Sequence, residues 1–342
     1  MNQTDRKEKT SSGGKTVSLV LGSGGARGLA HIGVIEELER RGYRIAAVAG
    51  SSMGALVGGI HALGELDTYS DWVRSLNQAD VVRLLDWSLS GGGMIRGDKL
   101  IRKLKDLVGE KDIEDLPIPY TAVAVDIERG REVWISDGSL FDAIRASIAI
   151  PAVFAPHHYR GRALVDGGLL NPVPVAPTLR TLTDLTIVVD VNGPVTDLDR
   201  GDGRDDETVD EGEPGLLHRV VEYVESLGEK ATDAAQEIAL SEVLMRSLET
   251  MQTALTRHHL AVFQPDLVIS IPKNVCMFHE FHRADAVIEA GRKIAAERLD
   301  TLPPQNRGQT PPETGVRPHR SKHVRTWRNT TKTMGYRCET GV

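Results

Sequence analysis

Two segments in which an apolar strand runs directly into a glycine-rich turn and a helix constrain the fold of this chain most strongly. In the first, the apolar residues Thr16–Leu21 lead into residues 22–28, which contain four glycines, and helical spacing of apolar residues follows,. In the second, residues 45–49 lead into Gly-Ser-Ser-Met-Gly at 50–54, again followed by a helical pattern. Repeated strand–turn–helix units predict an α/β protein with parallel strands.

Strand-like and helix-like segments continue to alternate beyond these two units. The expected elements are strands at 120–126 and 132–135 that resemble a hairpin, a helix at 140–150 stopped by Pro151, strands at 163–165, 185–191 and 266–272, and a closing helix at Ala284–Leu299,. The pattern therefore predicts an α/β fold in which helices flank a mainly parallel central sheet.

Composition divides the chain into one large domain and polar segments. A hydrophobic fraction of 40% in 342 residues is enough for a sizeable core, which we assign to residues 16–300,. The polar residues 1–15 predict a flexible N-terminus without a signal peptide. Residues 196–215 are strongly acidic and predict a disordered insertion, and residues 301–342 predict a disordered basic tail,.

Charge and cysteine content limit the partners and the compartment. A net charge of -7 argues against nucleic acid as the main partner,. The two cysteines, Cys276 and Cys338, are far apart in sequence and predict no structural disulfide, which favours the cytoplasm,. No apolar run is long enough to span a membrane, so any membrane contact is expected to be peripheral. None of these features indicates an oligomeric state.

The Gly-Ser-Ser-Met-Gly turn indicates a serine nucleophile. Between a strand and a helix, such a turn exposes its middle residue, Ser52, at the top of the sheet,. Gly50 and Gly54 allow the backbone to turn this tightly. The five-residue pattern alone also occurs by chance, and its position between strand and helix is what favours a catalytic role.

The glycine loop at 22–28 fits three kinds of site unequally. A dinucleotide-binding loop needs a third glycine where this chain has Arg27, and a P-loop needs Lys and Ser or Thr where Gly28 is followed by Leu29,. An oxyanion hole fits better, because glycines expose backbone N–H groups at a helix N-terminus, where the dipole favours negative charge. A tight turn without chemistry stays open as the alternative.

A serine nucleophile also needs a base within hydrogen-bond reach. No histidine follows a strand and a turn as a triad histidine does, and His31 and His61, inside the helices beside the two turns, are better explained as structural residues,. The remaining candidate is Asp166, which follows a short apolar strand and precedes Gly167 and Gly168. An ordinary Asp-Gly hairpin turn would explain the same residues.

Four sequence blocks, taken in order, resemble the motifs of the patatin-like phospholipase family. The blocks are residues 22–28, residues 50–54, Ala-Ser-Ile-Ala-Ile-Pro at 146–151 and Asp-Gly-Gly at 166–168. The resemblance is strongest for the bacterial branch and for the related catalytic domain of neuropathy target esterase, and it covers about residues 17–299. Four ordered motifs are far more specific than any one of them.

The resemblance implies a three-layer α/β/α fold and a Ser-Asp dyad in place of a triad. Ser52 would be the nucleophile and Asp166 the base. The oxyanion would be bound by the N–H groups of Gly24, Gly25 and Ala26.

Two further residues of the first block follow from the same resemblance. Arg27 is expected to help fix the oxyanion loop. Ser23 replaces a glycine that is common in the family, at a position where backbone donors, not side chains, should matter.

The predicted function is a serine acyl-ester hydrolase that acts on lipids, of phospholipase A or lysophospholipase type, with an acyl-enzyme intermediate. This chemistry needs no metal or other cofactor. Two alternatives remain on the same fold. One is a soluble carboxylesterase or thioesterase without lipid preference, and the other is a catalytically silent regulatory protein.

Overall fold

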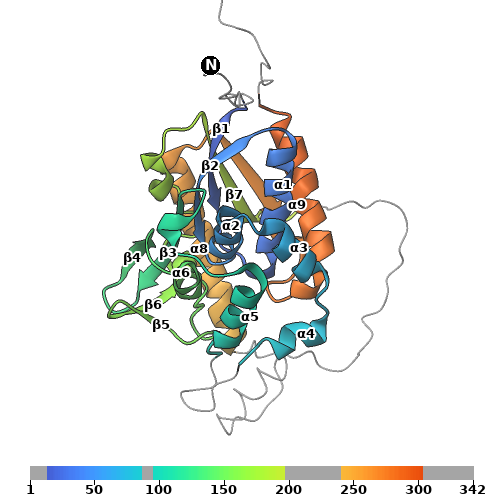
Figure 1. The fold of residues 1–342 in the computed structure, drawn as a ribbon. Helices are drawn as coiled ribbons and strands as arrows, with labels where there is room; N and C mark the ends of the chain where they lie inside the picture. Colours follow the sequence, from blue (N-terminus) through green and yellow to red (C-terminus); the bar gives the residue numbers. More distant parts are fainter. Residues whose placement is uncertain (1–13, 87–94, 197–239, 303–342) are drawn as a thin grey trace, which may run out of the picture. The chain divides into compact units, whose positions relative to one another are not determined.

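The structure, a computed structural model, describes residues 14–86, 95–196 and 240–302 (Figure 1). All of these belong to one compact unit, Met1–Gln305. The expected flexible N-terminus at 1–15, acidic insertion at 196–215 and basic tail at 301–342 lie almost entirely outside the described residues, and they stay predictions.

Eight strands and eight α-helices are found in the described part of the chain. The strands are β1 Thr16–Leu21, β2 Arg44–Ser51, β3 Tyr120–Asp126, β4 Arg131–Ile135, β5 His157–Tyr159, β6 Arg162–Asp166, β7 Leu185–Gly193 and β8 Leu267–Pro272. The helices are α1 Ala30–Arg40, α2 Met53–Leu63, α3 Leu66–Arg74, α4 Gln78–Arg83, α5 Asp98–Val108, α6 Leu140–Ser147, α8 Leu240–Phe263 and α9 Ala284–Leu299. Short 3-10 helices include η1 Gly25–Leu29, η3 Gly167–Leu169 and η4 Ala176–Arg180.

One mixed sheet runs through the centre of the unit, and hydrogen bonds link its strands along the path β5-β6-β3-β2-β1-β7-β8, with β4 also paired to β3. Five strands, β3, β2, β1, β7 and β8, run parallel to one another. The remaining strands pair antiparallel: β4 and β6 with β3, and β5 with β6. The prediction of a mainly parallel sheet is therefore confirmed, and β3 and β4 form the expected hairpin.

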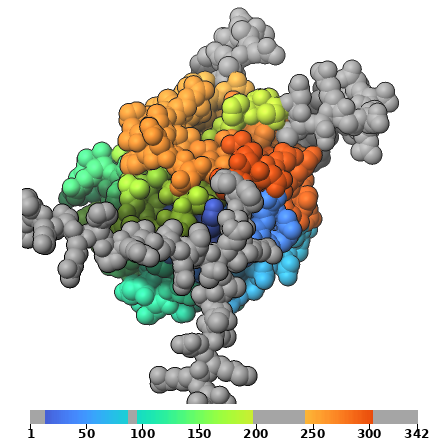
Figure 2. Space-filling model, turned by 90° about the horizontal axis from the view of Figure 1, so that it is seen from above, coloured from blue at the N-terminus to red at the C-terminus, as the bar shows by residue number. Residues whose placement is uncertain are grey.

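Helices cover both faces of this sheet (Figure 1). Alternate residues of β1 point to opposite faces. Leu19 and Leu21 belong to the large core formed with α1, α2, α6 and α9, and Val20 packs in a smaller cluster with Leu260 and Phe263 of α8. Figure 2 shows the orange segment that includes α8 on the surface of the molecule. The three-layer α/β/α arrangement is thus confirmed.

The described helices differ from membrane-spanning helices in length or in apolar character. None of them, including the long α8, combines the length and the apolar character needed to cross a membrane,.

Candidate active site

Ser52 lies at the sharp turn between β2 and α2. Its φ of 55° and ψ of -124° are unusual for a residue with a side chain, and strain of this kind persists only where the surroundings hold it,. Gly54 makes the turn possible, because a Cβ there would lie 2.0 Å from the Leu21 carbonyl oxygen. The turn therefore packs directly against the end of β1, with Ser52 buried at the start of a helix.

A second serine holds this turn in place. The Ser52 N–H donates to Ser147 Oγ at 2.9 Å, and the Ser147 hydroxyl donates to the Val123 carbonyl oxygen at 2.6 Å. All three groups are buried, so no water replaces these bonds,. Ser147 belongs to the 146–151 block, but the sequence alone did not indicate that its side chain holds the Ser52 turn.

The position of Asp166 follows from how two strands end on β3. β4 occupies one edge of β3, so β2 and β6 share the other edge. β2 runs parallel to β3 and ends at Ser51, opposite Val123, whereas β6 runs antiparallel and ends at Asp166, opposite Ala124. Because Val123 and Ala124 are consecutive, the ends of β2 and β6 meet, which brings Ser52 beside Asp166.

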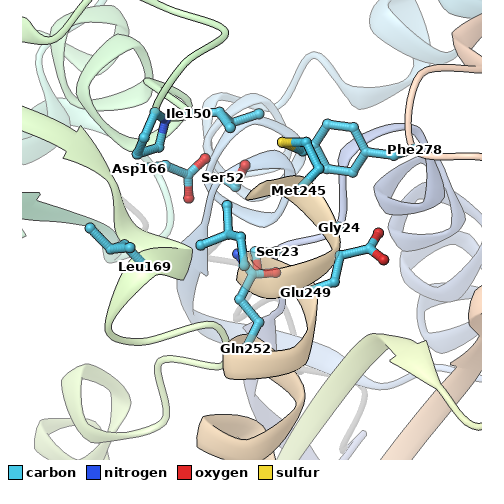
Figure 3. Close-up of a pocket in the computed structure, with 12 residues that line it drawn as sticks. Ser23, Gly24, Ser52, Ile150, Asp166, Leu169, Met245, Glu249, Gln252 and Phe278 are labelled. Carbon is cyan, nitrogen blue, oxygen red and sulfur yellow. The ribbon is translucent and has the colours of Figure 1, made fainter. Parts of the chain in front are cut away.

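The Asp166 carboxylate is buried, with 3% of the residue exposed. Its Oδ1 accepts from the Gly168 N–H at 2.7 Å, so Asp166 caps η3 and the Asp-Gly pair is not a hairpin turn. Oδ2 makes no hydrogen bond with any described residue, and the carboxylate points toward Ser52 (Figure 3). Burial raises the pKa of Asp166 from 3.8 to about 7, although the nearby Ser52 hydroxyl and the Gly168 N–H act in the opposite direction,.

The glycine loop reaches the same site from the end of β1. Gly24 lines the pocket beside Ser52, and Gly25 has a φ of 57°, which favours glycine,. No hydrogen bond of the Gly24 or Gly25 N–H is found among the described residues. The Ala26 N–H instead donates to the Phe278 carbonyl oxygen at 2.8 Å. The expectation that Ala26 supplies a free N–H is therefore not met in this structure.

Arg27 connects the glycine loop to distant parts of the chain. Its buried guanidinium donates to the Cys276 carbonyl oxygen at 3.3 Å, to Asn192 Oδ1 at 2.8 Å and to Glu249 Oε1 at 2.9 Å. These contacts join the loop to the segment after β8, to β7 and to α8.

Ser52 and Asp166 open into a small pocket that α8 covers (Figure 3). Four lining residues come from α8: Met245, Leu248, Glu249 and Gln252. The enclosed space is about 10 Å³, roughly enough for one water molecule,.

The contributions of α8 and Phe278 to this pocket were not expected from the sequence. Phe278 packs directly against Gly25, where a Cβ would lie 2.5 Å from its ring. The apolar helical pattern of α8 was the available signal, but such a pattern does not show which part of the core a helix covers.

The histidines that the structure describes lie outside the pocket. His31 is fully buried, and its Nε2 bonds the Gly22 carbonyl oxygen at 2.8 Å. Burial lowers the pKa values of His31 and His61 to about 4, so both are neutral near pH 7,. In the part of the chain that the structure describes, no histidine lines the pocket.

Comparison with known proteins finds relatives among patatin-like phospholipases and NTE family proteins. The family described as patatin-like phospholipase matches residues 19–179. An uncharacterized NTE family protein of Mycobacterium tuberculosis is 41% identical, and the match covers 84% of this chain and 92% of that protein. A second such protein from the same species is 31% identical, and the match covers 85% of this chain and 47% of that protein.

Two further matches are with proteins from other organisms. Patatin-like phospholipase domain-containing protein 6 of Mus musculus is 33% identical over 182 residues, which are 51% of this chain and 13% of that protein. Among solved structures, VipD from Legionella pneumophila matches with a TM-score of 0.46 and 16% identity, over 84% of this chain and 67% of that chain.

Proposed function

Because the chain belongs to the patatin-like phospholipase family, among the NTE family proteins, its general chemistry is lipid acyl hydrolysis, and we propose a specific form of it. The protein is a phospholipase A or lysophospholipase that cleaves carboxylic esters through a Ser-Asp dyad. Ser52 is the nucleophile and Asp166 is the general base.

One observation supports this proposal above all. Asp166 is a buried carboxylate that points toward Ser52, and its Oδ2 has no hydrogen-bond partner among the described residues. A raised pKa near 7 suits a general base at neutral pH, since the group can then both accept and return a proton,. The positive φ of Ser52 is backbone strain of the kind that gathers at active sites,.

In the first half of the reaction, the Ser52 hydroxyl attacks the ester carbonyl carbon while Asp166 takes its proton. The negative oxygen of the tetrahedral intermediate is bound by the free N–H groups of Gly24 and Gly25. A well-placed donor of this kind contributes about 3 kcal/mol in other hydrolases. The intermediate then collapses, the alcohol leaves with the proton from Asp166, and the acyl group stays on Ser52.

In the second half, a water molecule attacks the acyl-enzyme carbonyl while Asp166 takes its proton. Collapse of this second intermediate returns the proton to Ser52 Oγ and releases the carboxylic acid. One carboxylate therefore serves both halves, as microscopic reversibility allows.

Apolar side chains beside Ser52 suit the acyl chain. The pocket is lined by six such residues: Ile150, Pro151, Leu169, Met245, Leu248 and Phe278. A space of about 10 Å³ cannot hold an acyl chain, so substrate entry requires α8 or the Phe278 segment to move.

The proposal is tested by measuring fatty acid released from palmitoyl lysophosphatidylcholine and from phosphatidylcholine vesicles. The wild-type protein should hydrolyse at least one of them. Ser52→Ala and Asp166→Asn should each lose at least about 10²-fold in kcat, and the double variant should lose little more, because the two residues act as a unit.

Asp300→Asn, which removes an exposed carboxylate from the end of α9, is the matched control and should keep full activity. Hydrolysis of a short p-nitrophenyl ester without hydrolysis of either lipid would favour a soluble carboxylesterase or thioesterase. Turnover that survives Ser52→Ala would exclude the proposed nucleophile.

A further inference from the structure

Ser23 carries a buried hydroxyl that has no hydrogen-bond partner in the part of the chain that the structure describes. Its backbone is fully held, since the N–H donates to the Pro172 carbonyl oxygen at 2.9 Å and the carbonyl accepts from Asn192 Nδ2 at 2.7 Å. The side chain is different: Ser23 is 3% exposed, lines the pocket, and its Oγ makes no hydrogen bond. A buried hydroxyl without a partner destabilises a fold, whereas alanine or glycine at this position would carry no such cost.

Gln252 of α8 places a second free polar group at the same point. A Cβ on Gly168 would lie 2.8 Å from Ser23 Oγ and 2.8 Å from Gln252 Nε2, so the two groups converge on Gly168. The Gln252 side chain forms no hydrogen bond with the rest of the described chain. Glu249, the other polar α8 residue of the pocket, is already paired with Arg27 at 2.9 Å.

The convergence point lies on the Asp166 side of Ser52. The Gly168 N–H donates directly to Asp166 Oδ1 at 2.7 Å, so Gly168 is in contact with the general base. In Figure 3, the side chains of Ser23 and Gln252 lie close together, away from Phe278.

The chemistry of ester cleavage determines which part of the ester binds near Gly168 and Asp166. Asp166 must return a proton to the alcohol oxygen as the ester bond breaks, so the alcohol part lies near Asp166 and the acyl chain lies elsewhere. We propose that Ser23 Oγ and the Gln252 amide form a subsite that hydrogen-bonds a free hydroxyl group on the alcohol part. This inference rests on the proposed function and adds a preference for esters of polyols.

Two esters that differ only in the alcohol hydroxyls isolate this preference. 1-Octanoylglycerol and propyl octanoate have the same acyl chain and the same three-carbon alcohol, but only the first carries free hydroxyl groups. The kcat/KM ratio of glycerol ester to propyl ester should fall about fivefold to tenfold in Ser23→Ala and in Gln252→Leu, since each variant loses one substrate hydrogen bond. The propyl ester, which offers no hydroxyl group to the subsite, should lose less kcat/KM than the glycerol ester in both variants.

Thermal unfolding and a control variant complete the test. Ser23→Ala should unfold at a temperature no lower than the wild type, because the lost hydroxyl has no partner among the described residues,. Ser18→Ala removes another buried serine hydroxyl, near the opposite end of β1, and should leave the substrate ratio unchanged.

The outcomes distinguish the subsite from the proposed function. If wild type hydrolyses both esters and the ratio is unchanged in Ser23→Ala and Gln252→Leu, the subsite is wrong while ester hydrolysis stands. An equal loss on both esters would likewise overturn the subsite, because it would show a general effect on the active site. A wild-type protein that hydrolyses neither ester nor any of the phospholipids would overturn the proposed function and the subsite together.

Discussion

At the scale of single residues, Ser52 and Asp166 are both held in states that lower the stability of the fold. Ser52 has a positive φ without being glycine, and Asp166 is a buried carboxylate without a countercharge among its hydrogen-bond partners. Such features are typical of active sites, where the surrounding structure maintains an arrangement that packing alone would not favour. They also give the pair measurable signatures.

The first signature is the pH dependence of hydrolysis. Asp166 accepts a proton only when it is ionised, so kcat/KM should rise with pH, reach half its maximum near pH 7 and level off above it,. Initial rates on p-nitrophenyl butyrate between pH 5 and pH 9 measure this directly. A rate that is flat across this range, or that falls as pH rises through 7, would contradict the assignment of Asp166 as base.

The second signature is the pH dependence of stability. The pKa of Asp166 is raised from 3.8 to about 7 by folding, so between these values the folded state binds the extra proton, and stability falls as pH rises through this window,. Asp166→Asn removes the buried charge while its side-chain oxygen can still accept from the Gly168 N–H. The variant should therefore unfold at a higher temperature than wild type at pH 8, with a smaller difference at pH 4.5. An equal difference in unfolding temperature at both pH values would show that burial does not raise the pKa of Asp166.

At the scale of elements, the site depends on where segments distant in sequence end. Ser52 follows β2, Asp166 follows β6, and both strands stop against consecutive residues of β3. Ser147, at the end of α6, joins the Ser52 turn to the same part of β3. Four elements therefore have to be in register before the nucleophile and the base can meet.

Ser147 gives this register a direct test. Ser147→Ala leaves the Ser52 N–H and the Val123 carbonyl without their partners in a buried site, which should cost about 2 kcal/mol of unfolding free energy,. Because the Ser52 turn is then less well held, kcat on p-nitrophenyl butyrate should fall about tenfold. Ser18→Ala, which breaks a hydrogen bond to Thr183, should lower stability with kcat unchanged. Full activity in Ser147→Ala would show that this bond does not position Ser52.

Local patterns in the sequence predicted the elements well, for a physical reason. The period of apolar residues determines whether a segment forms a strand or a helix, so β1, β2, β7 and α9 were expected at almost the observed bounds,. The turn at Ser52 and the candidate base Asp166 were also accessible, because glycines mark tight turns.

Contacts between distant segments were not accessible from such patterns. The Phe278 carbonyl oxygen accepts a hydrogen bond from the Ala26 N–H, so one expected oxyanion donor is already occupied. These two residues are far apart in the chain. Ser23 was expected to matter only through its backbone, yet its buried hydroxyl lines the pocket without a hydrogen-bond partner in the described chain. Gln252 lies in a helix whose apolar pattern predicts burial but not which residues face the site,.

At the scale of the whole molecule, all described residues of the site lie within the unit Met1–Gln305. The glycine loop, the Ser52 turn, Asp166, α8 and the Phe278 segment are each contributed by this unit. The polar tail at 301–342 and the acidic segment at 196–215 contribute no described residue to the pocket.

Truncation tests whether the unit suffices for catalysis. A protein that ends at Gln305 should keep kcat/KM on p-nitrophenyl butyrate within about twofold of the full chain, and replacing residues 197–215 with a short Gly-Ser linker should do the same. Circular dichroism and thermal unfolding verify that each shortened protein is folded. Loss of hydrolysis in a folded truncated protein would show that these segments belong to the catalytic machinery.

The most direct test of the central claim is covalent labelling by a fluorophosphonate probe, followed by mass spectrometry of the labelled peptide. Fluorophosphonates react with serines that are activated as nucleophiles. A single adduct on Ser52, absent from Ser52→Ala and strongly slowed in Asp166→Asn, is the predicted result. An adduct on another residue, or labelling that persists in Ser52→Ala, would contradict the account.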